Sequence, residues 1–135
     1  MLIQRHLFLY FSQLKALYKL VNEYGGLLIQ AHPLRGGKNV ILDLNYLDGL
    51  EINCHPLYDG SHLNYLSSVS NENNLILTCG GDFHNDTHRA KCGVYFDDTI
   101  ITIEEVVEYL RLTSTIKMCI QEPDSMLSFD FIYEK

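Results

Sequence analysis

Long apolar segments are absent from this sequence. A membrane-spanning helix needs about 18–20 apolar residues in a row, and no segment of the 135 residues approaches that length. The run Leu7–Phe11 is too short for the core of a signal peptide, and no small-residue cleavage site follows it. We therefore expect a cytoplasmic protein with no membrane partner.

Positive charge is also in short supply. Ten Lys and Arg residues stand against seventeen Asp and Glu residues, which gives a net charge of −7. This balance argues against a broad electrostatic grip on nucleic acid. A small anionic substrate is not excluded, because a bound cation reverses the local field.

Paired cysteines are missing too. The four cysteines are widely spaced and include no C-x-x-C pair; they are Cys54, Cys79, Cys92 and Cys119. This pattern predicts reduced, mostly buried thiols. The sequence also has no internal repeats, linkers or low-complexity segments, and 47% of its residues are apolar. We expect one folded domain spanning residues 1–135.

Hydrophobic spacing predicts the helices and strands. Apolar residues at three- and four-residue steps predict a helix over 4–24, which ends at Gly25 and Gly26. A weak helix is expected over 61–70 with Ser61 as N-cap, and a capping box at Thr102 and Glu105 opens a helix to about Leu112. The expected strands lie at 27–31, 50–52, 75–77, 93–96 and, with irregular alternation, 126–133. Residues 40–47 are compatible with either a helical turn or a short strand.

Alternating strands and helices predict an α/β fold with a parallel sheet and right-handed crossovers. Polar residues follow three of these strands: His32, Asn53 with His55, and Asp82 with His84. The carboxyl ends of parallel strands meet at one rim. Gly80 and Gly81 would let the chain turn sharply before Asp82. The carboxylate of Asp82 and the imidazole of His84 would then share one space, which indicates a metal site.

Three motifs carry a family resemblance. QAHPLR at 30–35, DGLEIN at 48–53 and GGDFH at 80–84 resemble, in order and spacing, the last motifs of the PHP family, the polymerase and histidinol phosphatase superfamily. The resemblance extends from about Tyr18 to Leu112. It implies a distorted (β/α)7 barrel with a metal cluster at the carboxyl ends of the strands, and hydrolysis of phosphoric esters.

The same motifs imply roles for individual residues. By resemblance, His32, Asp82 and His84 are the metal-binding and catalytic residues, with Gly81 standing where the family has Ser. Imidazole and carboxylate ligands suit zinc, manganese or iron.

Substrate contacts are expected around these ligands. Arg35 is a candidate contact to a small phosphorylated substrate, and Glu51 is expected to support the site. Arg89 is either a phosphate contact or part of a solvated edge. The roles of His55 and His88 stay open.

The sequence departs from the family pattern at its start. The family site begins with an H-x-H pair, whereas this sequence has His6 and then His32. The chain therefore resembles the second half of a PHP domain, a parallel-sheet partial barrel that lacks the N-terminal half. Three ligands can hold one metal ion but not a cluster.

Two functions remain in view. One is a metal-dependent phosphoesterase, and the alternative is a non-catalytic α/β remnant that binds metal or a partner without turnover. A partial barrel leaves strand edges open, so we also expect a homo-oligomer or a partner chain near 27–31.

Overall fold

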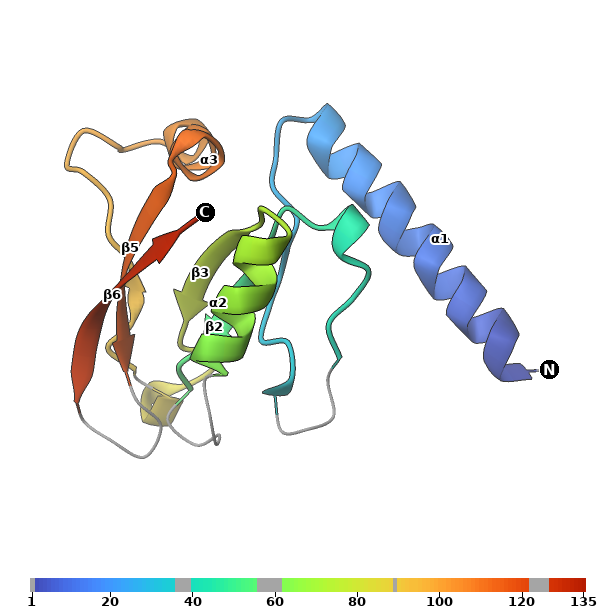
Figure 1. Ribbon diagram of the computed structural model, residues 1–135, viewed down its shortest axis with the longest axis horizontal. Helices are drawn as coiled ribbons and strands as arrows, with labels where there is room; N and C mark the ends of the chain where they lie inside the picture. Colours follow the sequence, from blue (N-terminus) through green and yellow to red (C-terminus); the bar gives the residue numbers. More distant parts are fainter. Residues whose placement is uncertain (1, 36–39, 56–61, 89, 122–126) are drawn as a thin grey trace.

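Two small sheets form the framework of the chain (Figure 1). The computed structural model describes residues 2–35, 40–55, 62–88, 90–121 and 127–135, with the backbone only for 2–11 and 88. The parallel sheet has the order β1-β2-β3, with β1 at Ile29–Gln30, β2 at Gly49–Asn53 and β3 at Ile76–Gly80. The antiparallel sheet has the order β4-β5-β6, with β4 at Gly93–Val94, β5 at Thr115–Gln121 and β6 at Ser128–Glu134. The α/β class and the parallel sheet are as predicted, but the described residues form no closed barrel.

Helix α1 (Leu2–Glu23) confirms the predicted N-terminal helix. Its end is a Schellman motif, in which Gly25 N–H donates to Asn22 O at 3.0 Å and Gly26 N–H donates to Val21 O at 2.9 Å. Gly25 takes a φ of 78°, a left-handed conformation that glycine adopts without a steric penalty. The helix is only partly covered, because Leu14 is buried while Leu17 is about half exposed.

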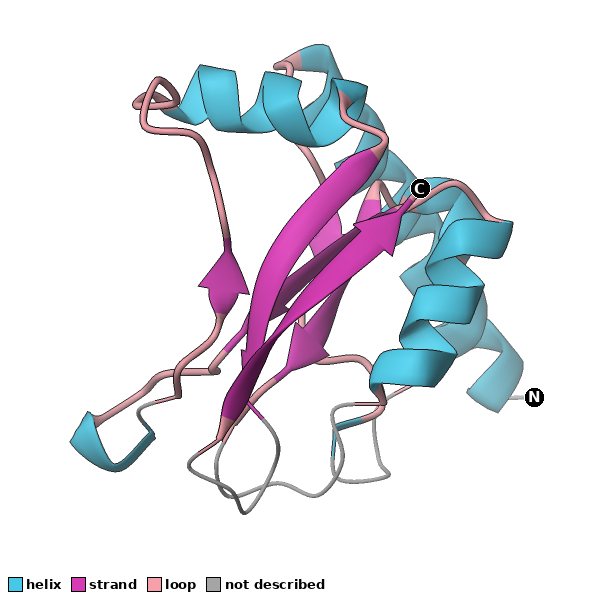
Figure 2. Ribbon diagram, turned by 60° about the vertical axis from the view of Figure 1, so that its left-hand side comes forward, coloured by secondary structure: helices cyan, strands magenta, loops and turns pink. Residues whose placement is uncertain are grey.

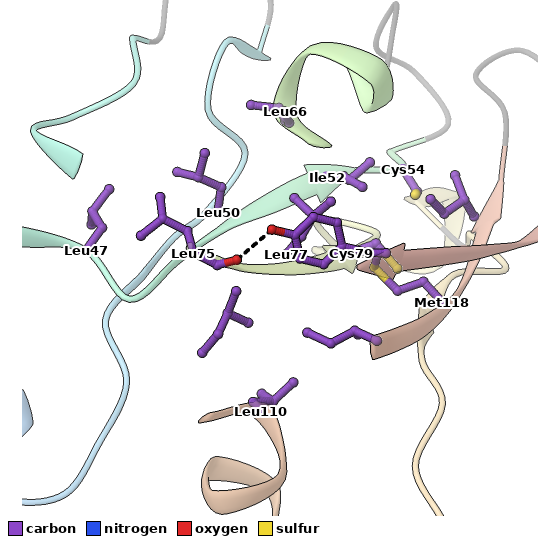
Figure 3. Close-up of a cluster of buried hydrophobic side chains, with 14 of the residues drawn as sticks. Leu47, Leu50, Ile52, Cys54, Leu66, Leu75, Leu77, Cys79, Leu110 and Met118 are labelled. Atoms are coloured by element: carbon purple, nitrogen blue, oxygen red, sulfur yellow. Dashed lines mark hydrogen bonds between the residues drawn. The ribbon is translucent and has the colours of Figure 1, made fainter. Parts of the chain in front are cut away.

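The parallel sheet supplies much of the core. β2 lies in the middle, and its register pairs Leu50 with Leu77 and Ile52 with Cys79. All four side chains are buried, which explains the short continuous apolar runs in the sequence. Figure 3 shows Leu66 and Leu110 approaching these strands from opposite sides.

Helix α2 (Leu63–Glu72), which carries Leu66, confirms the predicted helix but not its cap. The N-cap is His62, with a left-handed φ of 52° and no side-chain cap hydrogen bond. Ser61, the predicted N-cap, lies outside the described residues. This helix therefore depends on burial of Leu66, not on a cap, for its start.

The C-terminal half contains the largest departure from prediction. The capping box of α3 (Ile103–Leu112) is confirmed, with Thr102 N–H donating to Glu105 Oε2 at 2.8 Å and Glu105 N–H to Thr102 Oγ1 at 3.2 Å. Two residues after α3 the chain enters the seven-residue strand β5, for which no strand was predicted, and β5 pairs with β6 in an antiparallel hairpin. Figure 2 shows the two strands side by side over their whole length.

The hairpin packs against the parallel sheet. Ile116, Met118 and Ile120 alternate along β5 and are fully buried. The Tyr133 hydroxyl of β6 donates to Leu75 O at 2.8 Å, drawn as the dashed line in Figure 3. The Cys79 thiol donates to Cys119 O at 3.3 Å. The hairpin thus contacts β3 near both of its ends, through a side chain of β6 and through the backbone of β5.

The short elements correct several expected boundaries. β1 has two residues instead of the five predicted at 27–31, and β4 has two instead of four at 93–96. The open choice at 40–47 is settled as a helical turn, the 3-10 helix η2 (Leu44–Tyr46). Among the helices in the described ranges, none is both long and apolar enough to cross a membrane.

Candidate functional site

The candidate site lies where the strands of the parallel sheet end. β1, β2 and β3 run in the same direction, so the loops that follow them lie along one edge (Figure 1). These loops carry His32 and Arg35 after β1, and Asp82 and His84 after β3. The loops that carry Arg35 and Asp82, almost 50 residues apart in sequence, therefore lie together. This agrees with the prediction that the polar residues after the strands meet at one edge of the sheet.

Asp82 is the centre of this edge. Its side chain is only 8% exposed, and its Oδ2 forms an ion pair with Nη1 of Arg35. Its Oδ1 lies 3.0 Å from Nε2 of His84, whose side chain is 68% exposed. The predicted proximity of Asp82 and His84 is present in the structure. The guanidinium of Arg35 is a third member of the same cluster.

The surroundings of Asp82 set its charge. Burial acts to raise the pKa of the carboxyl. The opposing effects are larger together and lower the pKa below its ordinary 3.8: Arg35 contributes a hydrogen bond and its charge, His84 a hydrogen bond, and His32 an electrostatic interaction. Asp82 is therefore ionised at neutral pH. An ionised carboxylate only accepts hydrogen bonds, so Nε2 of His84 carries the hydrogen of this contact.

Glu51 of β2 holds the loop that carries His32. Its Oε2 accepts a hydrogen bond from the backbone N–H of His32 at 3.0 Å, and His32 takes a left-handed φ of 35°. Glu51 thus holds the backbone of the loop that carries His32, and its role at a substrate site stays a prediction.

The two glycines before Asp82 serve a purpose other than the predicted sharp turn. The left-handed residue is Asp82 itself, with a φ of 48°, and neither Gly80 nor Gly81 needs a positive φ. A Cβ on Gly80 would lie well under 3.0 Å from Oε1 of Glu51. Gly80 thus provides the room in which the Glu51 carboxylate lies.

Gly81, where the family pattern has Ser, packs against the segment that precedes β4. A Cβ at this position would lie 3.2 Å from Cβ of Ala90 and 3.5 Å from Sγ of Cys92. The contact with Ala90 is tight and the contact with Cys92 is an ordinary van der Waals contact, so a larger residue at position 81 would require Ala90 to shift. Glycine at this position therefore has a local packing reason.

The remaining predicted residues are placed differently. His55 is buried, with its backbone N–H donating to Oδ1 of Asn53 at 2.9 Å, and so belongs to the packed interior beyond β2. Arg89 and the side chain of His88 lie outside the described residues. No role at the site is assigned to these three.

A group of thiols lies at the ends of β2 and β3 and was not predicted as a group. The Cys54 thiol is in hydrogen-bonding contact with those of Cys79 and Cys92, and contact with Cys79 and burial raise its pKa to about 12. All four cysteines are free, and Cys54 and Cys79 are buried. The strand register brings Cys54 and Cys79 close, which sequence spacing alone does not reveal.

The donor types suit a divalent transition metal, since the imidazoles of His84 and His32 act on the carboxylate of Asp82. In the described ranges, however, no three His, Cys, Asp or Glu side chains are arranged to hold a metal ion. His32 acts electrostatically on Asp82, and His84 contacts it directly. Arg35 and His84 contact the two oxygens of Asp82. The candidate ligands are therefore neighbours, but the described residues do not form a metal-binding arrangement.

The chain was compared with known protein families, curated proteins and solved structures. No family model, curated protein or solved structure matches this chain.

Proposed function

We propose that this protein is a PHP-type metal-dependent phosphoesterase. Asp82, His84 and His32 would hold a divalent cation (zinc, manganese or iron), and Arg35 would contact a small phosphorylated substrate. The proposal is carried by one observation: the Asp82 carboxylate contacts both Arg35 and His84 at the carboxyl edge of a parallel sheet. An imidazole, a carboxylate and a guanidinium are thereby neighbours, which are the groups that the proposed metal and phosphate sites need. On this view, β1–β3 belong to a partial barrel, and the free thiols fit a cytoplasmic protein.

A bound divalent cation lowers the pKa of coordinated water and offsets negative charge on phosphoryl oxygens. The residues of the chain prepare the site for this. Asp82 supplies a negative charge that is already present at neutral pH. Hydrogen bonding to Asp82 fixes the ring of His84, and Glu51 fixes the backbone at His32. The planar fork of Arg35 matches two phosphate oxygens.

The alternative function is a non-catalytic module that binds metal or a partner. It is favoured by the absence of an H-x-H pair from this sequence, since three donors serve one cation. Binding and turnover therefore need separate measurements.

Metal binding is measured first, by thermal unfolding of the metal-free chain with and without zinc or manganese. A ligand at about 100 times its Kd stabilises the folded state by about 2.7 kcal/mol, which raises Tm by several degrees. Asp82→Asn should abolish this rise. The matched control is Asp98→Asn, which removes the same charge from an exposed residue elsewhere and should retain the rise. No metal effect on the wild-type protein would overturn the proposal.

Turnover is measured next, on a simple phosphate monoester. We expect little hydrolysis, because three donors leave either the attacking or the leaving oxygen without a cation. Any activity should require metal and be lost in His84→Ala but not in His62→Ala, which changes an exposed histidine at the start of α2 whose side chain makes no cap hydrogen bond. Metal binding without binding of inorganic phosphate would favour the non-catalytic alternative.

A further inference from the structure

A polar hollow lies at the edge of the parallel sheet where β2 and β3 begin, opposite the edge that carries Asp82. It has a volume of about 410 Å³. Its walls come from the segments around the starts of these two strands, from η2, from the turn after α2 and from the C-terminal end of α3. In Figure 1 this is the upper edge of the sheet, near the C-terminus of the chain.

Two cationic side chains line this hollow, those of Arg111 and Lys135. Lys135 donates from Nζ to Arg111 O at 2.8 Å and to Leu110 O at 3.4 Å, and Arg111 donates from Nη2 to Gly26 O at 2.5 Å. Backbone carbonyls thus hold both side chains at the C-terminal end of α3, where the helix dipole favours positive charge. These contacts leave N–H groups of both cations available to a ligand.

Neither cation has an acidic partner. In the part of the chain that the structure describes, neither Arg111 nor Lys135 forms an ion pair, although seventeen acidic residues stand against ten basic ones. Two like charges that line one hollow repel each other, and an anion bound beside them would offset this repulsion. The hollow is therefore an exception in a chain of net charge −7, and its cations suit an anionic ligand.

The remaining polar groups of the hollow suit hydroxyl groups. Asp48 accepts a hydrogen bond from Leu28 N–H at 2.7 Å through Oδ2, and no described residue donates to its Oδ1. The carboxamide of Asn74 lines the same hollow and forms no hydrogen bond with the described residues. The carboxamide nitrogen of Asn73 donates to Val69 O at 2.8 Å, which leaves its oxygen as an acceptor. Asp48 would repel an anionic group, so it is a partner for hydroxyl donors.

Hydrogen bonds fix the walls of the hollow. Ile76 N–H donates to Asp48 O at 2.9 Å, which joins the starts of β2 and β3. The hydroxyl of Tyr133 donates to Leu75 O at 2.8 Å, which ties the start of β3 to β6. The hollow is therefore formed before any ligand binds, and a preformed site lowers the entropic cost of binding.

We propose that this hollow binds a small anion that also carries hydroxyl groups, such as a phosphate monoester or a hydroxy acid. Arg111 and Lys135 hold the phosphate or carboxylate group, and Asp48 and Asn74 hold the hydroxyl groups. The volume of about 410 Å³ lies within the range of small-molecule sites, about 300–1,000 Å³, and exceeds what inorganic phosphate needs. This site is separate from the Asp82 cluster and depends neither on a metal nor on the proposed phosphoesterase function.

The experiment is a titration of the isotopically labelled, metal-free full chain, followed by two-dimensional NMR at low ionic strength. The probes are glycerol phosphate, glycerate and glycerol. Backbone amide shifts locate the bound molecule, and the largest changes should occur at Asn74, Leu75 and Lys135 and not at Asp82 or His84. Glycerol, which lacks an anionic group, should cause no change. Glycerol phosphate and glycerate together show which anionic group the site prefers.

Two charge variants test the cations. Arg111→Gln and Lys135→Gln should each weaken the binding of the preferred anion about tenfold, as expected for the loss of one charge-assisted hydrogen bond. The matched control is Lys19→Gln, which makes the same change at an exposed residue of α1 outside the hollow and should bind as the wild type does. Both test variants also lose a contact with a backbone carbonyl, so only the affinity, measured on folded protein, tests the proposal. Circular dichroism checks the fold.

Asn74→Gly tests the hydroxyl contacts. Asn74 has a left-handed φ of 52°, which glycine adopts without strain, so the substitution removes the carboxamide and retains the backbone. It should weaken the binding of glycerol phosphate severalfold and leave that of inorganic phosphate unchanged. Equal affinities of the wild type for glycerol phosphate and inorganic phosphate would overturn the hydroxyl contacts.

The location and the charge variants decide the proposal together. Shifts at the hollow that require higher ligand concentrations in Arg111→Gln and Lys135→Gln support it. Shifts confined to Asp82 and His84 overturn it, as does the absence of any shift or an unchanged affinity in both charge variants. If one of these variants does not fold, the other still tests the site. The proposed function is tested by metal binding at Asp82, so either proposal can fail alone.

Discussion

Gly80→Ala is the sharpest probe of how the site is supported. The added Cβ would lie well under 3.0 Å from Oε1 of Glu51, an approach that real side chains do not make. Gly80 has no positive φ, so the alanine backbone itself is not strained. The carboxylate, which is the end of a flexible side chain, has to move instead. Its movement breaks the 3.0 Å hydrogen bond to the backbone of His32.

The expected loss of stability follows from two opposing effects. A hydrogen bond to a charged group contributes about 1.5–3 kcal/mol. Replacing Gly by Ala at a permitted backbone conformation stabilises the folded state by about 0.4–1 kcal/mol, because the unfolded chain has less conformational freedom to lose. The net loss is therefore about 1–2 kcal/mol, or a decrease of several degrees in Tm.

The assay is urea unfolding of a double-mutant cycle with Glu51→Ala. If Gly80→Ala acts by displacing Glu51, it should cost little or nothing once the Glu51 carboxylate has been removed. Gly49→Ala provides a contrast, because its Cβ would meet the backbone oxygen of Ile76 at 2.5 Å, which cannot swing away. It should destabilise more than Gly80→Ala in either background. Additive losses for Gly80→Ala and Glu51→Ala would refute the reasoning.

Two further properties should be measurable. The pKa of Asp82 is lower in the folded chain than its ordinary 3.8, so the ionised form stabilises the fold above that pH, and the stabilisation is lost as the pH falls through the folded pKa. Below about pH 4, the urea midpoint of the wild type should therefore fall more than that of Asp82→Asn. In this variant Asp97, Glu105 and Asp130, whose pKa values are also lowered, still titrate. If the urea midpoints of the two proteins fell in parallel with pH, the lowered pKa of Asp82 would be contradicted. Self-association or dependence on a partner is also expected, because β1 has few paired residues and Tyr24, Ile103 and Leu112 are exposed. Light scattering at micromolar concentration measures it, and a stable monomer would argue against open edges.

Local signals in the sequence were sufficient for much of the fold. The Schellman end of α1 and the capping box of α3 depend on residues close together in the chain, and both were predicted. The apolar runs of β2 and β3 are short but bounded by glycines and polar residues. The polar residues that follow these two runs in the sequence correctly predicted the edge of the sheet at which Asp82 and His84 lie.

The missed features depend on contacts between distant segments. β5 alternates buried Ile116, Met118 and Ile120 with residues of the outer face, a visible period-two signal that was not used. The place of Arg35 beside Asp82 requires β1 and β3 to lie on either side of β2. The need for glycine at position 80 arises only when the register places Glu51 beside it.

The antiparallel hairpin also changes how the site should be viewed. A partial barrel predicts that β3 presents a bare face, whereas the Tyr133 side chain of β6 contacts the chain at Leu75 and the backbone of β5 contacts Cys79. The loop after β3 is therefore anchored, and Asp82 with it. The loop after β1 is held as well, because Glu51 accepts a hydrogen bond from the backbone N–H of His32 and Pro33 in the same loop is fully buried. The ion pair between Arg35 and Asp82 therefore joins two loops that are each anchored to the folded framework.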